Sequence, residues 1–282
     1  MKGNVIKATL ILAACLLTII IYTLPKTEST VKRAGTEDHP ASGSGYFTEL
    51  EKRQTANLSE EKKTALAQWK KLTKEKSSGN QVYFDSIASV WDEMKLFALS
   101  AYYFEQKATV DQSEKTYLNA AYRYFDAMKQ AVDTSVKNMM TQKAIHAYNK
   151  VLELNPGNLN AKSDLGVLYA EGTNEPMKGI TLLREVVAEN PDHEMAQMNL
   201  GFLSFKSNQY EKAIERFDKV LSINPARIDM HIYKAQTYQQ LNQNDKAIAE
   251  LELFIASSDS KEMVAEAVKL IEELRAVKSL NP

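Results

Sequence analysis

The sequence is poor in the residues that build disulfides and metal centres. Its 282 residues include one cysteine, four histidines, ten glycines and seven prolines. A single cysteine excludes a disulfide within the chain. The histidines show no metal-ligand spacing such as H-E-x-x-H, and no second cysteine completes a zinc site with them. We therefore expect no metal centre and no cofactor; the scattered histidines are His39, His146, His193 and His231.

Charge of one sign is also lacking. The formal net charge is −1, so no strong positive field points to nucleic acid. The folded part lacks a G-x-S-x-G nucleophile motif, a glycine-rich phosphate loop and a thiol nucleophile, because the one cysteine, Cys15, lies in the first apolar run. These absences predict a protein that is not an enzyme.

What the sequence does contain is helical composition, rich in Ala, Leu, Lys and Glu. The stretch 199–225, NLGFLSFKSNQYEKAIERFDKVLSINP, predicts two helices joined by a polar turn at 206–209. Small residues at Gly201 and Ala213 allow two antiparallel helices to approach closely, and Phe217 fills the space beside them. Pro225 ends the second helix, since proline lacks an N–H and disfavours the α conformation in the residue before it.

The same spacing recurs along the chain. Three Asn-Pro pairs stand 35 and 34 residues apart, and small residues recur at the same intervals in both helices. Four series in register predict a repeat array. The repeat-defining positions are Ala121, Ala144, Pro156, Gly166, Gly179, Pro191, Gly201, Ala213, Phe217, Pro225, Ala235 and Ala247.

A pattern of Leu-Gly, then Ala-x3-Phe, then Pro over 34 residues resembles the tetratricopeptide repeat. The resemblance implies an all-α solenoid of helical hairpins that binds another chain. The combination of a short apolar N-terminus and such repeats resembles the architecture of the repeat modules in bacterial cytochrome c maturation and nitrite reductase assembly proteins. No C-x-x-C-H motif accompanies that similarity.

The N-terminal run Ala8–Leu24 is 17 residues long and carries no charge, which is the short end of a membrane-spanning helix. We interpret it as an uncleaved signal-anchor, because no small-x-small cleavage site follows promptly. A cleaved signal peptide and lipidation at Cys15, in the lipobox-like Leu-Ala-Ala-Cys, remain alternatives. Lys2 and Lys7 favour an N-terminus inside, with the body in the periplasm of a bacterium.

The predicted organisation has five parts: an anchor at 1–24, a flexible linker at 25–45, an N-terminal helical hairpin at 46–110, repeats at 111–258, and a capping helix at 259–282. We expect the second hairpin helix at 85–108. The repeats divide into 111–158, 159–191, 192–225 and 226–258, with about 11 residues inserted around 132–140 of the first as a helical turn and loop. The capping helix is predicted to turn Met263, Ala267, Ile271 and Leu274 inward.

The resemblance also implies which side chains face a concave groove. They come from the first helix of each repeat, at fixed offsets such as −3, −2 and +1 from the Gly or Ala position. We predict a partner-binding groove of Asn119, Tyr122, Asp126, Ser163, Asp164, Val167, Met198, Asn199, Phe202, Lys206, Ile232, Tyr233, Gln236 and Gln240.

These positions mix aromatic, amide and apolar residues without the Lys and Asn of a carboxylate clamp, so a peptide or helix with apolar anchors is the predicted ligand. For the apolar ones, packing between adjacent repeats is the alternative. The expected role is a non-catalytic, membrane-anchored scaffold in an envelope assembly pathway. Self-association and a part in cytochrome c maturation are the alternative functions.

Overall fold

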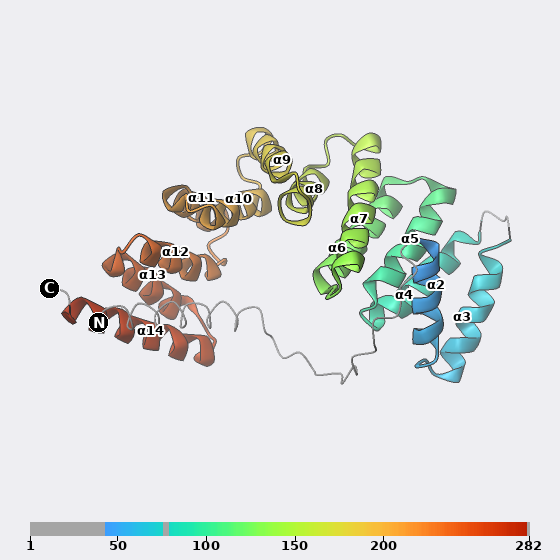
Figure 1. Cartoon of the computed structure of the whole chain (residues 1–282), viewed down its shortest axis with the longest axis horizontal. Coiled ribbons are helices and arrows are strands. Elements are labelled where there is room, and N and C mark those ends of the chain that lie inside the picture. Colours follow the sequence, from blue (N-terminus) through green and yellow to red (C-terminus); the bar gives the residue numbers. More distant parts are fainter. Residues whose placement is uncertain (1–42, 76–78, 281–282) are drawn as a thin grey trace. The chain divides into compact units, whose positions relative to one another are not determined.

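The computed structural model describes residues 43–75 and 79–280 (Figure 1). This described part contains 13 α-helices and no strand. The described residues divide into two compact units, one ending at Met230 and a second beginning at His231. The first unit contains α2 (Ser44–Thr55), α3 (Glu60–Leu72), α4 (Gln81–Glu93), α5 (Phe97–Asp111), α6 (Glu114–Gln130), α7 (Thr134–Leu154), α8 (Leu159–Gly172), α9 (Pro176–Glu189), α10 (Glu194–Lys206) and α11 (Tyr210–Ile223).

The predicted anchor at 1–24 and residues 25–42 of the predicted linker lie outside the described residues. Within residues 43–75 and 79–280, no helix is both long and apolar enough to cross a membrane. Near the end of the predicted linker, α2 already begins at Ser44.

The prediction of a two-helix hairpin at 46–110 was wrong, because this region forms four helices, α2 to α5. The expected helix at 85–108 is interrupted after Glu93. Lys95 has a φ of 56°, and the Leu96 amide donates to the Trp91 carbonyl at 2.8 Å. This is the Schellman arrangement that ends a helix, here without the glycine that usually marks it.

The repeats pair α6 with α7, α8 with α9 and α10 with α11, and the predicted close approach of their helices is confirmed. A Cβ added at Gly179 would lie 2.2 Å from the Gly166 carbonyl oxygen. A Cβ added at Gly201 would lie 2.7 Å from Cε1 of Phe217. At Gly179 the contact is with backbone atoms, so only glycine fits there without a shift of the neighbouring helix, whereas the contact at Gly201 is with side-chain atoms.

The insertion in the first repeat takes the form of additional helix. The helix α7 has 21 residues, whereas its counterparts α9 and α11 have 14 each. Asp133 caps its start by accepting hydrogen bonds from the amides of Ser135 and Val136. Met140, the last residue of the extension, is completely buried, and Val136 and Met139 pack partly buried against the core, so one side of the added helix is covered.

The second unit contains α12 (Asp229–Gln240, of which the first two residues belong to the first unit), α13 (Asn244–Ser257) and α14 (Lys261–Leu280). Along α14, Ala267, Ile271 and Leu274 are buried as predicted. Met263 is 37% exposed, so its predicted inward orientation was wrong. It lies in the first turn of the helix, immediately after the connection from α13.

Candidate functional site

The candidate groove in the first unit is formed by α6, α8 and α10, the first helices of three successive repeats. Most of the predicted positions on these helices are only partly covered by their neighbours, and Lys206 is exposed. This half-buried state lets a side chain be held in place by the fold and still contact a partner. The half-buried positions are Asn119, Tyr122, Asp126, Asp164, Val167, Asn199 and Phe202.

Three predicted groove residues are buried, so they offer a partner little surface. The exposed fractions are 1% for Ser163, 9% for Met198 and 6% for Ile232. All three stand at the −3 offset of their repeats. Met198 is covered by Arg227, whose guanidinium lies 2.9 Å from its sulfur. The Ser163 hydroxyl has no hydrogen-bond partner among the described residues.

The most structured part of the groove is the seam where α6, α7 and α8 meet. The ring of Tyr122 on α6 packs edge-on against the ring of Tyr148 on α7, with centroids 6.0 Å apart. The Tyr148 hydroxyl donates a hydrogen bond of 3.0 Å to the Asp164 carboxylate on α8. Two rings and a carboxylate are thus connected across three helices.

The carboxyl group of Asp164 is partly withdrawn from water. Desolvation raises its pKa above the ordinary 3.8, and the nearby Asp126 carboxylate raises it further. The Tyr148 hydrogen bond and the Lys129 ammonium act in the opposite direction. A desolvated carboxylate beside aromatic rings gains by accepting a hydrogen bond or a cation from a ligand.

Farther along the groove, α8 and α10 are joined at their exposed side. Lys206 forms an ion pair with Glu171. The ring of Phe202 lies 5.4 Å from the ring of Phe217, so part of its surface serves the helix pair α10–α11. Val167 packs against the core formed by residues such as Leu183 and Leu200. Packing between repeats, the alternative interpretation of the apolar positions, therefore applies in part to Val167 and Phe202.

The predicted groove residues of the fourth repeat belong to the second unit. Here Tyr233 and Gln236 are half-buried and Gln240 is exposed. The structure therefore holds the predicted residues in two separate sets, one on α6, α8 and α10 and the other on α12.

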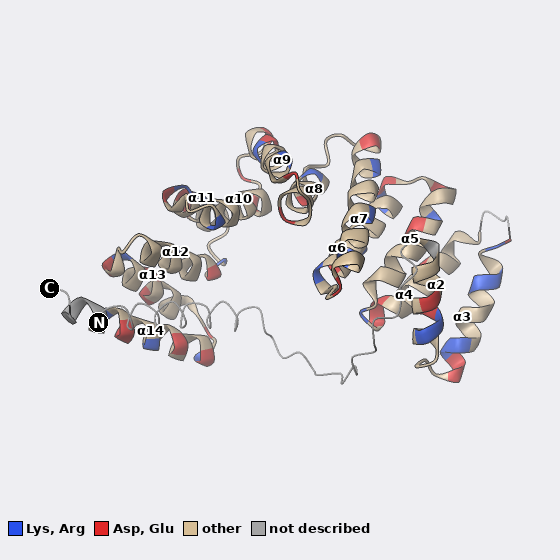
Figure 2. Cartoon of the chain, viewed as in Figure 1, with Lys and Arg blue, Asp and Glu red and all other residues tan. Residues whose placement is uncertain are grey.

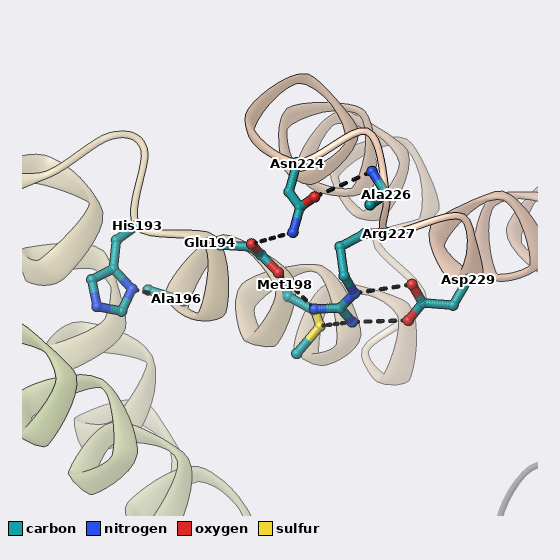
Figure 3. A network of polar contacts seen from close by, with 8 residues as sticks. All are labelled: His193, Glu194, Ala196, Met198, Asn224, Ala226, Arg227 and Asp229. Carbon is teal, nitrogen blue, oxygen red and sulfur yellow. Dashed lines mark hydrogen bonds and ion pairs between the residues drawn. The ribbon is translucent and has the colours of Figure 1, made fainter.

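The asparagines of the Asn-Pro pairs have a structural role that sequence reasoning missed. Figure 3 shows Asn224, at the end of α11, donating a hydrogen bond of 3.0 Å to Glu194 in the first turn of α10. Glu194 also pairs with Arg227 at 2.7 Å, and Arg227 pairs in turn with Asp229 at 2.8 Å. The Asn224 hydrogen bond and then Arg227 lower the pKa of Glu194.

The first repeat contains the same contact. Asn155 at the end of α7 donates to Glu114 in the first turn of α6, at 3.0 Å. We call this contact the Asn–Glu clamp. The sequence signal that would have predicted it is an acidic residue in the first turn of a repeat together with the asparagine that ends the same repeat. The clamp fixes the two helices of one repeat at their open ends and so sets the spacing of the groove helices.

Residues 43–75 and 79–280 contain no group of three or more His, Cys, Asp or Glu side chains that could hold a metal ion. Acidic and basic residues both occur along the described helices (Figure 2). The chemistry that this part of the chain offers is that of a contact surface with aromatic, amide and carboxylate groups.

Comparison with known proteins agrees with the repeat architecture. Residues 204–265 match the family model described as tetratricopeptide repeat. The RNA polymerase-associated protein CTR9 of Saccharomyces cerevisiae is 35% identical over 79 residues, which are 28% of this chain and 7% of that protein. The match thus spans a small fraction of this relative.

Among solved structures, a crystal structure of MamA protein superposes with a TM-score of 0.51 at 19% identity, covering 64% of this chain and 93% of that chain. MamA 41-end from Desulfovibrio magneticus RS-1 gives a TM-score of 0.51 at 17% identity, with coverages of 64% and 97%. At these identities the likeness concerns the fold alone. The described residues are therefore all-helical, their fold resembles that of these solved structures, and residues 204–265 match the tetratricopeptide repeat model.

Proposed function

We propose that this chain is a non-catalytic scaffold that binds a protein or peptide partner on the surface of α6, α8 and α10. Tetratricopeptide repeat proteins bind protein partners, and the fold supports that class of function. The observation that carries the proposal is the seam of Tyr122, Tyr148 and Asp164, where the half-buried Tyr122 ring and a desolvated carboxylate are both held by the buried Tyr148 side chain. Aromatic residues held in this way anchor partners at little cost in conformational entropy.

The partner that suits this surface presents an apolar side chain beside a hydrogen-bond donor. The apolar group would pack on Tyr122 and Phe202, while an amide, hydroxyl or cationic donor would approach Asp164. Such a donor would compensate the desolvation of the carboxylate. Asn199, half-buried on the neighbouring α10, offers a side-chain amide to the backbone of the bound segment.

We further propose that the chain is held by residues 1–24 at a bacterial inner membrane, with the body on the periplasmic side. The uncharged run Ala8–Leu24 and the two preceding lysines support this placement. An envelope assembly pathway follows from this location. A part in cytochrome c maturation is the alternative pathway and rests on the resemblance of the anchored repeat architecture.

The test is affinity capture from detergent-solubilised membranes, with the wild-type chain compared with the variant Tyr122→Ala/Asn199→Ala/Phe202→Ala. A matched control, Arg184→Ala/Glu185→Ala, changes exposed residues of α9. We expect a protein that the wild type and the control retain and the groove variant loses while keeping its helical circular dichroism. Equal retention by all three chains would place partner binding elsewhere and refute the groove assignment.

Self-association is a second candidate function, favoured by exposed apolar side chains in the second unit. Leu253 on α13 and Val268 on α14 are 50% and 42% exposed, and Met263 adds to this apolar surface. A second copy of the chain would cover them. Sedimentation of the chain separates the candidates, because a strict monomer at tens of micromolar excludes self-association.

A further inference from the structure

The first helices of three successive repeats each begin with a side-chain cap. Ser113 caps α6, Asn158 caps α8 and His193 caps α10, and each accepts a hydrogen bond from the backbone amide three residues later. Serine and asparagine are preferred at this position, whereas histidine is not. Of these three caps, the histidine alone changes its charge between about pH 5 and about pH 8. The third repeat therefore carries a titratable group where the two preceding repeats carry neutral ones.

The contacts of the His193 ring define its protonation state. The Ala196 amide nitrogen donates to Nδ1 of His193 at 3.2 Å, as Figure 3 shows. A backbone amide can only donate, so Nδ1 carries no proton and the ring is neutral. The proton of the neutral ring is then on Nε2, which donates to Oδ1 of Asn160 at 3.0 Å. One neutral tautomer thus satisfies both contacts.

The second contact of the ring joins α10 to the preceding repeat. Asn160 lies in the first turn of α8, and His193 immediately precedes α10. Asn158, the cap of α8, forms a similar contact one repeat earlier, where its side-chain amide donates to Glu114 in the first turn of α6 at 2.8 Å. A cap that also contacts the first helix of the preceding repeat is therefore a recurrent feature, and between α8 and α10 it depends on a histidine.

A second proton on the His193 ring is incompatible with the cap. It would occupy Nδ1 and point at the Ala196 amide, so that two donors would face each other. The positive ring would also stand at the N-terminus of α10, where the helix dipole disfavours a cation. The ring must then turn away from the amide. Because both nitrogens belong to one rigid ring, the contact with Asn160 is lost together with the cap.

The surroundings of the ring do not compensate an added positive charge. Burial lowers the pKa of His193 below its ordinary 6.5, and a backbone hydrogen bond of the same residue acts in the opposite direction. The carboxylates nearest to His193 in the chain each have a cationic partner, on α8, on α11 or in the loop before α12. The pairs are Glu189 with Lys162, Asp192 with Lys219, and Glu194 with Arg227.

We propose that His193 is a pH switch between two groove helices: its protonation uncaps α10 and releases Asn160 on α8. The ring is in place at neutral pH and leaves in mild acid, which loosens the first turn of α10 and its junction with α8. Because the folded-state pKa is lowered, the contribution of the neutral ring to stability is complete above pH 6.5 and is lost as the pH falls from 6.5 through the lowered value. The switch is a property of the fold and is independent of the proposed partner binding.

The test is amide hydrogen exchange of the full-length chain in mild detergent, followed by mass spectrometry at about pH 7.5 and about pH 5. Exchange is expressed as a protection factor relative to the intrinsic rate at each pH, so that the pH dependence of the exchange chemistry cancels. The first turns of α6 and α8 are internal controls, because their caps do not titrate. The variant His193→Asn keeps a cap that cannot be protonated. The matched control His146→Asn removes an exposed histidine from α7.

We expect the protection factor of the first turn of α10 to fall about fivefold or more from the higher to the lower pH, which is the effect of losing an N-cap. The first turns of α6 and α8 should change clearly less. His193→Asn should abolish the fall in α10, and His146→Asn should preserve it. An equal fall in all three first turns, or a fall that persists in His193→Asn, would overturn the proposal. His193→Ser decides the outcome if His193→Asn loses its helical signal. No partner is needed, so the result does not depend on whether the groove binds one.

Discussion

The substitution Gly179→Ala tests whether helices α8 and α9 are held as closely as the structure shows. An added Cβ would lie 2.2 Å from the Gly166 carbonyl oxygen and 2.4 Å from the Ala170 amide nitrogen. Both atoms belong to the backbone of α8, so no side-chain rotation relieves the contact. The two helices must separate to accept the methyl group.

Two opposing effects set the magnitude. Alanine stabilises a helix interior by about 1 kcal/mol relative to glycine. Overpacking of a close contact costs about 1–3 kcal/mol, and a rigid backbone contact belongs at or above the upper end of that range. We therefore expect a net loss of about 2 kcal/mol in the free energy of unfolding. For a unit of this size the loss corresponds to about 4–8 °C in melting temperature.

Urea unfolding followed by circular dichroism measures this loss. Gly201→Ala is the matched control, because its Cβ would meet the Phe217 ring at 2.7 Å and Cβ of Arg216 at 3.2 Å, both side-chain atoms. We expect a clearly smaller loss there, since the ring can rotate away. A Gly179→Ala protein as stable as the wild type, or more stable, would refute the close backbone approach of α8 and α9.

Two further predictions concern the polar contacts. Because burial raises the folded-state pKa of Asp164 above its ordinary 3.8, the native state binds the proton more tightly, and this group's contribution to stability falls as pH rises from 3.8 through the raised value. Asp164→Asn should remove that part of the pH dependence and give a larger free energy of unfolding than the wild type above this pH window. Urea unfolding at several acidic pH values measures the difference. A variant with the same pH dependence as the wild type would contradict the desolvation of Asp164. Asn224→Ala removes the hydrogen bonds to Glu194 and from the Ala226 amide and should lower the unfolding free energy by about 1–2 kcal/mol. The control Asn190→Ala loses only a hydrogen bond from the Asp192 amide and should lower it less. Equal losses would contradict a stabilising role for the contact between Asn224 and Glu194.

The helix pairs of the repeats could be predicted because their spacing is imposed by sterics that appear directly in the sequence. Gly166, Gly179 and Gly201 stand where a Cβ would collide with the neighbouring helix, so small residues recurring every 34 or 35 positions carried the information. The break after Glu93 could not be predicted in the same way. Lys95 adopts the left-handed conformation there without glycine or asparagine to announce it.

The partners of the groove residues were less predictable than the helices. Tyr148 lies on the second helix of its repeat, while the groove positions were sought only on first helices. Its contacts with Tyr122 and Asp164 depend on how α7 packs against α6 and α8. Such contacts between helices require the three-dimensional arrangement, because no fixed sequence separation encodes them.

The offsets themselves separate into packing and surface positions. At −3, Ser163, Met198 and Ile232 of the last three repeats are buried although their polarity differs widely, whereas Leu118 of the first repeat is half-buried. In these three repeats burial therefore follows from the repeat geometry rather than from residue type. At −2, Asp164, Asn199 and Tyr233 are half-buried and differ in size and polarity from one repeat to the next. The −2 positions can vary in residue type because they are only half-buried, although Asp164 also accepts a hydrogen bond from Tyr148. Specificity for a partner should therefore reside in the −2 series, and exchange of Asp164 and Asn199 should alter binding while leaving the unfolding free energy nearly constant apart from the pH-dependent contribution of the carboxylate.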